Sequence, residues 1–330
     1  VEVDAYVVSV YYALLGATLY MVSNWPRLRD IAGKAKARVS TVLQPIRGVP
    51  ARLIIFPLII VIALEWIAAV NAPDNRLHVF FFDVGQGDAI FIETPAGQNI
   101  LIDGGPADGE VAARLGKRLS FWKRSIDLVV LTHPHEDHIG GLVDVLGRYQ
   151  VKQVLECPVK YDSPVYDEWR SLVEEKGIRR TEACAGQHIE LGQGVRLEVL
   201  YAGGARSDDE ASEIDNDSVV LRLVCGNVSV LMTADIFEEA EQYLLNGRFD
   251  LSSTVLKVAH HGSDSSSCAE FLAEVHPQVA VISVGANNTF GHPSPEVVDR
   301  LSSIYLYRTD IEGTIEFISD GKRLWVKTER

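Results

Sequence analysis

The sequence predicts an α/β domain preceded by two membrane-spanning helices, and three observations support this prediction. From about residue 77 onward, short apolar runs typical of buried strands alternate with longer stretches of helical spacing. Several of these runs end abruptly in histidine or aspartate, most clearly 128–131, which a cluster of histidines follows. Near the start, two apolar runs are each about 18 residues long, close to the minimum for a helix that crosses a bilayer.

Residues 1–72 are predicted to form the membrane segment, with spans at about 5–22 and 53–70. The intervening loop, 23–52, carries seven basic residues and one acidic residue. The positive-inside rule therefore predicts a cytoplasmic loop, with both flanks on the opposite side of the membrane. A buried core helix is the alternative for each run, and Glu65 in the second run would have to face a partner helix or the interface.

The first run has neither the basic leader nor the cleavage site of a signal peptide. Because the chain begins at Val1 rather than Met, we expect it to be part of a longer membrane protein.

Charge and cysteine spacing narrow the classes of partner. The net charge is −14, and removing the loop's surplus of six positive charges leaves about −20, which repels polyanions. This argues against a high-affinity duplex binder, but not against an enzyme that acts on a strand delivered to it. The four cysteines lack Cys-x-x-Cys spacing, which argues against a thiolate zinc site. A disulfide and burial as small apolar residues both remain open.

A linker at 71–75 separates the membrane segment from a domain at 73–330. Strands are predicted at 77–82, 90–94 and 99–102, and a helix at 107–119. The turn 83–89 is either an ordinary hairpin, with glycines supplying positive φ, or it presents Gln86 and Asp88 to a functional site. Asp103 ends the third strand, and we expect it to orient a histidine or a loop amide rather than bind a metal directly.

The stretch 132–141 contains the densest set of metal-ligating side chains: His133, His135, Asp137 and His138. It follows the strand 127–131 and ends in two glycines, after which a helix is predicted to begin at 142–146. Divalent transition metals prefer imidazole and carboxylate ligands, and one short loop cannot complete a four-ligand shell alone. Further ligands must therefore come from elsewhere in the chain; a surface cluster of histidines is the alternative.

The second half of the domain repeats the pattern of strands that end in polar residues. Asp235 ends the second strand of a hairpin at 216–223 and 227–235, and His260 and His261 follow a strand at 256–259. Three strand ends thus supply ligand-type residues, which predicts a metal centre. His188, alone beside a short apolar run, is interpreted as structural.

Other elements complete the prediction. A loop at 202–214 is interpreted as a mobile cover for the substrate. Ser294 is expected to cap a helix that starts at Pro295, which places His292 just ahead of a helix N-terminus. The remaining predicted helices and strands are at 166–176, 195–201, 237–245, 279–284, 314–318 and 323–327.

Six short motifs occur in a fixed order: VGQGDA (84–89), IDGG (102–105), HPHEDH (133–138), NDSVVL (216–221), KVAHHGS (257–263) and GHPS (291–294). Together they resemble the metallo-β-lactamase superfamily and, within it, the C-terminal domain of ComEC-type competence proteins. Those proteins are DNA-internalisation channels of bacterial inner membranes. The resemblance implies an αββα sandwich with one or two divalent metal ions, Zn or Mn, and the positive-inside rule places this domain on the extracytoplasmic side.

The resemblance also implies roles for individual residues. One metal would bind His133, His135 and Asp235. The second would bind Asp137, His138, Asp235 and one of His260 and His261, with His261 favoured and Asp235 bridging. The first metal lacks a further histidine, because the region before Asp235 offers Asn216 and Asp217, so we expect that site to be weaker, wetter or empty. The candidate catalytic residues are His260, His292 and Asp137, and the candidate substrate-binding residues are Gln86, Asp88 and Asn216.

The function implied is that of a metal-dependent nuclease or phosphodiesterase that degrades the DNA strand that is not imported. Its partners would be single-stranded DNA, the bacterial inner membrane, the remainder of a DNA channel and other competence proteins. Two alternatives remain at this point. One is a small-molecule phosphoester, ester or lactone hydrolase that uses the same metals, and the other is a non-catalytic docking module.

Overall fold

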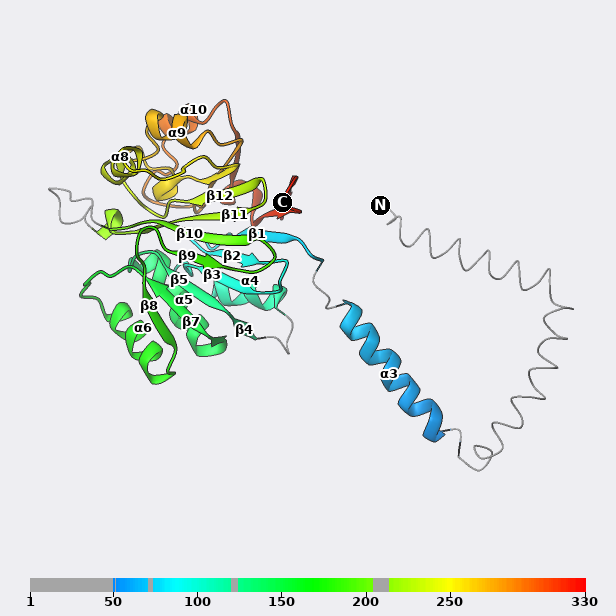
Figure 1. Ribbon diagram of the computed structural model, residues 1–330. Coiled ribbons are helices and arrows are strands. Elements are labelled where there is room, and N and C mark those ends of the chain that lie inside the picture. Colours follow the sequence, from blue (N-terminus) through cyan, green and yellow to red (C-terminus); the bar gives the residue numbers. More distant parts are fainter. Residues whose placement is uncertain (1–49, 51, 71–73, 120–123, 204–213) are drawn as a thin grey trace, which may run out of the picture. The chain divides into compact units, whose positions relative to one another are not determined.

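A computed structural model describes residues 50, 52–70, 74–119, 124–203 and 214–330, apart from the side chains of residues 54 and 67–70 (Figure 1). The chain divides into two units, Val1–Ala72 and Pro73–Arg330. The first predicted span, 5–22, and nearly all of the predicted cover loop lie outside the described residues.

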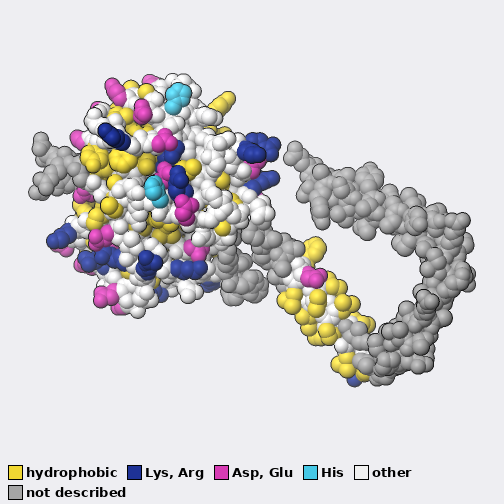
Figure 2. Space-filling model, viewed as in Figure 1, with side chains coloured by type: hydrophobic (Ala, Val, Ile, Leu, Met, Phe, Trp, Pro, Cys, Tyr) yellow, Lys and Arg dark blue, Asp and Glu magenta, His cyan; other side chains and the backbone are white. Residues whose placement is uncertain are grey.

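In the first unit, the second apolar run forms helix α3 (Arg52–Val70). Its described side chains are almost all apolar and exposed, and Glu65 is the single acidic residue among them (Figure 2). Taken over the residues that the structure describes, no helix is both long enough and apolar enough to cross a membrane.

The second unit is built on two β-sheets and a short two-stranded pair. The eight-stranded sheet contains, in spatial order, β17 (Leu324–Thr328), β16 (Ile315–Ser319), β1 (Leu77–Phe81), β2 (Ile90–Glu93), β3 (Asn99–Ile102), β5 (Leu128–Leu131), β7 (Gln153–Glu156) and β8 (Arg179–Glu182). The seven-stranded sheet contains β15 (Tyr305–Arg308), β14 (Val279–Ile282), β13 (Val255–Lys257), β12 (Val228–Met232), β11 (Val219–Cys225), β10 (Val195–Ala202) and β9 (His188–Glu190). The short pair joins β4 (Ser125–Ile126) and β6 (Gln150–Val151).

Helices cover the outer face of each sheet, on opposite sides of the domain in Figure 1. The eight-stranded sheet packs against α4 (Glu110–Arg118), α5 (Glu136–Arg148) and α6 (Pro164–Glu175). The seven-stranded sheet packs against α8 (Glu238–Asn246), α9 (Ala269–Val275) and α10 (Pro295–Arg300). The short helices η2 (Ala259–Gly262) and α11 (Thr309–Glu312) follow β13 and β15.

Three apolar cores follow from these layers. Successive side chains of a strand point to opposite faces, so Phe81 and Val130 enter the core between the sheets while Phe80 and Val129 enter the core under α4–α6. Both faces are covered, which explains why the central strands read as continuous apolar runs. Burial of a side chain such as Phe81 stabilises the fold by about 1.5–3 kcal/mol. The expected αββα arrangement is observed.

The helix after the histidines begins earlier than predicted. Helix α5 starts at Glu136, so His138 and the glycine pair lie inside it. A Cβ on Gly141 would lie 2.0 Å from the carbonyl oxygen of Gly104. The glycines therefore allow the turn after β3 to approach the helix backbone, and interpreting them as the break before the helix was wrong. Acidic residues in the first turn of α5 favour this earlier start, because they lie at the positive end of the helix dipole.

All four cysteines are free, so the alternative of a disulfide bond is excluded.

Candidate metal centre

The ends of several strands supply the side chains of the site. Strands β12, β13 and β14 are parallel, as are β3 and β5, so their carboxyl ends lie along the same edge of each sheet. His133 follows β5, Asp235 follows β12 and His261 follows β13. Residues separated by more than 100 positions in the sequence are therefore brought together.

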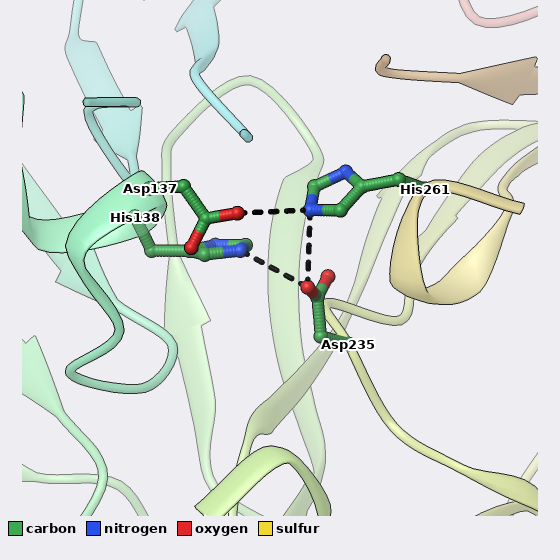
Figure 3. A group of neighbouring side chains, drawn as sticks. All are labelled: Asp137, His138, Asp235 and His261. Carbon is green, nitrogen blue, oxygen red and sulfur yellow. Dashed lines mark hydrogen bonds and ion pairs between the residues drawn. The ribbon is translucent and has the colours of Figure 1, made fainter. Parts of the chain in front are cut away.

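One ligand set consists of Asp137, His138, Asp235 and His261, which we call the inner set (Figure 3). Asp235 Oδ2 lies 3.2 Å from His138 Nε2 and 3.1 Å from His261 Nε2. His261 Nε2 is also 3.4 Å from Asp137 Oδ2. Two imidazole nitrogens and two carboxylates meeting at one point form a ligand set suited to Zn²⁺ or Mn²⁺.

A second set, which we call the outer set, consists of His133, His135 and Asp215. Asp215 Oδ1 lies 2.9 Å from His135 Nδ1 and 3.5 Å from His133 Nε2. Sequence reasoning missed Asp215, whose described neighbours 214–216 are helical, so it does not lie at a described strand end. The signal available was the acidic stretch directly before Asn216, and Asp215 supplies a further ligand for the site that had been expected to lack one.

Neighbouring groups determine which nitrogen of each histidine faces the site. His138 Nδ1 donates to Asp103 Oδ2 (2.8 Å) and His261 Nδ1 donates to the carbonyl oxygen of Ser283 (2.8 Å). His133 Nδ1 lies 3.0 Å from Thr132 Oγ1, which itself donates to Asp103 (2.7 Å). In all three histidines Nε2 is left for a cation, the arrangement that orients histidine ligands in metalloproteins.

Asp103 is placed to support the ligands, as the sequence suggested. Its Oδ1 accepts a hydrogen bond from the backbone amide of Thr132 (2.8 Å). Its Oδ2 accepts from Thr132 Oγ1 and His138 Nδ1, and the whole carboxylate is buried. Asp88, Asp103 and His138 form a third close group. The contacts of Asp103 with Thr132 and His138 already occupy both of its oxygens.

Lys257 is a buried cation that sequence reasoning did not single out. It lies at the end of β13, donates to the carbonyl oxygen of Ala234 (2.8 Å), and pairs with Asp88 and with Asp235 Oδ1 (3.3 Å). Asp235 is therefore held on one oxygen by Lys257, while its other oxygen faces the inner set. The available signal was a lysine that ends an otherwise apolar strand.

Two predicted substrate-binding residues lie beside the ligand sets, but their side chains are buried and bonded within the protein. Asp88 is buried and paired with Lys257, so it is not placed to contact a substrate. Asn216 is fully buried, and its Oδ1 accepts from the backbone amide of Phe237 (2.9 Å), which ties the outer-set turn to the segment before α8. Gln86 Oε1 accepts from Gly285 N (3.3 Å), joining the turn after β1 to the loop after β14.

The pKa shifts in the inner set show a strongly negative site. Burial opposes protonation of His261, but Asp235 and Asp137 raise its pKa to about 10. Burial likewise opposes protonation of His138, while Asp235, Asp137 and Asp103 raise its pKa well above the usual value. Burial would raise the pKa of Asp235, yet His261, His138 and Lys257 hold it well below its usual range. A site that binds protons this strongly would also attract a divalent cation, which displaces those protons.

Protonation differs in the outer set. Burial, and next the neighbouring His138, lower the pKa of His133 well below the usual value. Burial would lower the pKa of His135, but Asp215 raises it. The lowered pKa favours the neutral form of His133, which is the form that binds a metal. Nitrogen Nε2 of both His133 and His261 is buried and faces only the carboxylates of its own ligand set, which fits a bound ion.

The remaining histidine candidates lie beside the inner set. His260 precedes His261, and both have left-handed backbone conformations, with φ of 48° and 54°. Such conformations cost about 1–3 kcal/mol per residue and occur mainly at functional sites. His260 packs against His292, with ring centroids 5.5 Å apart, and neither Nδ1 atom has a hydrogen-bond partner.

Comparison with known proteins agrees with this geometry. Residues 82–286 match the metallo-β-lactamase superfamily. The chain is 30% identical to ComE operon protein 3 of Bacillus subtilis over 258 residues, covering 73% of this chain and 33% of that protein. It is also 30% identical to competence protein ComA of Neisseria gonorrhoeae over 249 residues, covering 74% and 33%. The chain therefore spans about a third of the length of these two relatives.

A further relative is exodeoxyribonuclease WalJ of Streptococcus pneumoniae, which is 25% identical over 176 residues, covering 50% of this chain and 60% of that protein. Among solved structures, the metallo-β-lactamase fold protein YhfI of Bacillus subtilis has a TM-score of 0.50 at 12% identity. The match covers 76% of this chain and 100% of that one, and at this identity it shows a similarity of fold. With homologues among ComEC-type competence proteins and a domain match over most of its second unit, the chain belongs to the metallo-β-lactamase superfamily.

Proposed function

We propose that residues 73–330 form a metal-dependent hydrolase that cleaves phosphodiester bonds in single-stranded DNA, and that it degrades the strand that is not imported during DNA uptake. The observation that carries the proposal is the pair of adjacent ligand sets, seven side chains of mixed imidazole and carboxylate character. The competence protein and exodeoxyribonuclease among the relatives support DNA as the substrate.

The inner and outer sets would each hold one divalent ion, Zn²⁺ or Mn²⁺, and Asp235 would contribute to both. Asp235 is close enough to the outer set to affect the pKa of His133. Such ions lower the pKa of a water molecule to near neutrality and neutralise charge on the phosphate oxygens.

The chain's own residues would complete the chemistry. Asp137 is the most accessible ligand of the inner set, with 34% of its side chain exposed, and could accept a hydrogen bond from an incoming water. His260 and His292 have unpaired Nδ1 atoms that could donate to a phosphate oxygen or protonate the leaving oxygen. Lys257 keeps Asp235 ionised and oriented.

We further propose that 1–72 is a membrane segment with spans at about 5–22 and 53–70. The domain would then lie on the extracytoplasmic side of a bacterial inner membrane. The basic residues of 23–52 and the exposed apolar side chains of α3 support this arrangement. The remainder of a DNA channel and other competence proteins would be its partners.

The experiment is a metal titration of nuclease activity. The full chain is purified in detergent, stripped with a chelator, and supplied with Mn²⁺ or Zn²⁺ in the presence of a labelled single-stranded oligonucleotide. We expect cleavage that requires the metal and that Asp137→Asn abolishes. Asp167→Asn is the matched control, because Asp167 lies in the first turn of α6, as Asp137 does in the first turn of α5, but is exposed and belongs to neither ligand set.

Cleavage that survives in Asp137→Asn, or that needs no metal, would refute the proposal. Hydrolysis of small phosphoesters, esters or lactones without cleavage of DNA would instead identify a small-molecule hydrolase. Retained DNA binding with neither metal uptake nor hydrolysis would identify a docking module.

A further inference from the structure

An exposed aromatic side chain lies beside the histidines of the candidate site. Phe290 is 68% exposed and belongs to the loop between β14 and α10. Its ring is stacked on that of His292, with centroids 5.9 Å apart and planes inclined by 27°. Single exposed apolar residues are common, so the significance of Phe290 depends on its surroundings.

Aromatic rings continue from Phe290 to the metal ligands. His292 packs edge to face on His260 (5.5 Å between centroids, 73°), and His260 on His261 (6.1 Å, 62°). Phe237 contacts the other side of His260 (4.9 Å, 88°). The series therefore begins at a ligand of the inner set and ends at a phenyl ring in solvent.

The loop that carries Phe290 is anchored on both sides. Asn288 Nδ2 donates to the carbonyl oxygens of Gly285 (2.9 Å) and His292 (2.7 Å), and its Oδ1 accepts from His292 N (3.1 Å). Ser294 N donates to the carbonyl oxygen of Gly262, in the turn that holds His261 (2.8 Å). Phe290 is thus held in a defined place relative to the metal ligands.

We propose that Phe290 is a base-stacking subsite, on which the nucleobase next to the cleaved phosphate packs while His292 and His260 contact that phosphate. The inference rests on the proposed nuclease function. Stacking on an aromatic ring needs no opposite charge and tolerates any base. It therefore offers a way for a chain of net charge −14 to hold single-stranded nucleic acid. One ring is far too small for a protein interface, which buries about 1,200–2,000 Å².

The test compares Phe290→Ala and Phe290→Trp with Tyr305→Ala in the full chain in detergent. Tyr305 is the matched control. It is 77% exposed at the start of β15, and because β15 runs parallel to β14, it lies at the sheet edge opposite the candidate site. Binding is measured by fluorescence anisotropy with labelled oligothymidylate and with an abasic oligonucleotide of the same length, in chelator. Cleavage of both is then measured with Mn²⁺.

We expect Phe290→Ala to weaken oligothymidylate binding about 5- to 140-fold, the range that base–aromatic stacking represents. It should raise the KM for oligothymidylate by a similar factor and leave kcat nearly unchanged. Binding and cleavage of the abasic oligonucleotide should also be nearly unchanged. Phe290→Trp should restore binding, and the added tryptophan should be quenched on saturation. Tyr305→Ala should bind and cleave as the native chain does.

Equal losses on the two oligonucleotides would overturn the proposal, since Phe290 would then act through the loop structure. Unchanged oligothymidylate binding in Phe290→Ala would also overturn it. A native chain that binds oligothymidylate through Phe290 but cleaves nothing would refute the nuclease function and leave the subsite standing.

Discussion

The inner and outer ligand sets share an edge of the sandwich but differ in how they are supported. In the inner set, Asp103 holds His138, a backbone carbonyl holds His261, and Lys257 holds Asp235. In the outer set, His135 has 30% of its side chain exposed, and its Nδ1 contacts Asp215 of the same set. Fixed ligands lose less freedom when an ion binds. We therefore expect the inner set to bind more tightly than the outer set.

The largest effect is expected from Asp235→Asn. The carboxylate of Asp235 faces both inner-set histidines, and Asp235 is the residue proposed to bind the metals of both ligand sets. Metal affinity should fall by more than the about 10- to 100-fold that loss of a supporting residue costs, and both ions should be affected. Bound metal is measured by elemental analysis after gel filtration. Retention of two ions per chain would show that Asp235 is not shared between the sets.

Lys257→Met tests the buried support of the inner set. Removing one partner of a buried ion pair costs about 3–5 kcal/mol in the free energy of unfolding, and here both Asp88 and Asp235 would lose it. Urea denaturation of the metal-free chain measures the loss. The control is Lys152→Met, whose exposed pair with Asp127 (2.6 Å) is worth about 0–1 kcal/mol. Equal losses in the two variants would contradict a special role for Lys257.

Asp103→Asn should weaken the inner set while leaving all of its ligands in place. The amide still fills the space but accepts a weaker hydrogen bond from His138 Nδ1, so we expect about a 10- to 100-fold loss of metal affinity. Calorimetric titration with Zn²⁺ measures this loss. Unchanged affinity would indicate that packing alone orients His138.

Asp215→Asn removes the carboxylate ligand of the outer set alone. We expect one ion per chain in place of two, with the inner-set affinity changed by less than about tenfold because none of its supporting contacts involves Asp215. The same elemental analysis detects the change. Loss of both ions together would mean that the two sets bind as one unit.

The smallest expected effect is on the number of protons that each ligand set releases when it binds metal. Without metal, the pKa of His261 is raised to about 10 and that of His133 is lowered. Near pH 8 the inner set should therefore release protons from His138 and His261 when it binds metal, whereas in the outer set only His135, whose pKa is raised, has a proton to release. For the same reason, His261 stabilises the metal-free fold below its unfolded pKa of about 6.5, and this stability is lost as pH rises toward 10. Calorimetry in buffers of different ionisation enthalpy counts the protons, and an equal release from both sets would contradict this assignment.

Much of the site could be predicted because six of its seven ligands lie close to a recognisable strand end. The loop with His133, His135 and His138 follows an apolar run, and so do Asp235 and His261. Parallel neighbouring strands bring their carboxyl ends together, so a local pattern predicted a contact over a long distance in the sequence. The supporting position of Asp103 followed from the same reasoning.

Other features could not be predicted, because they depend on which groups meet after folding. Asp215 does not lie at the end of a described strand, and the burial of Asp88 and Asn216 became apparent only from their partners, Lys257 and the segment before α8. The early start of α5 depended on glycines that admit the backbone of the β3 turn.

From the sequence alone follow the α/β fold, the strand ends and the types of ligand they supply, since hydrophobic periodicity and residue chemistry are local properties. Only the tertiary structure decided which carboxylate joins which histidine, which ring nitrogen faces the site, and which charges are buried together. The physical reason is that hydrogen bonds and electrostatic interactions of buried groups depend on distances between atoms that the chain brings together from far apart.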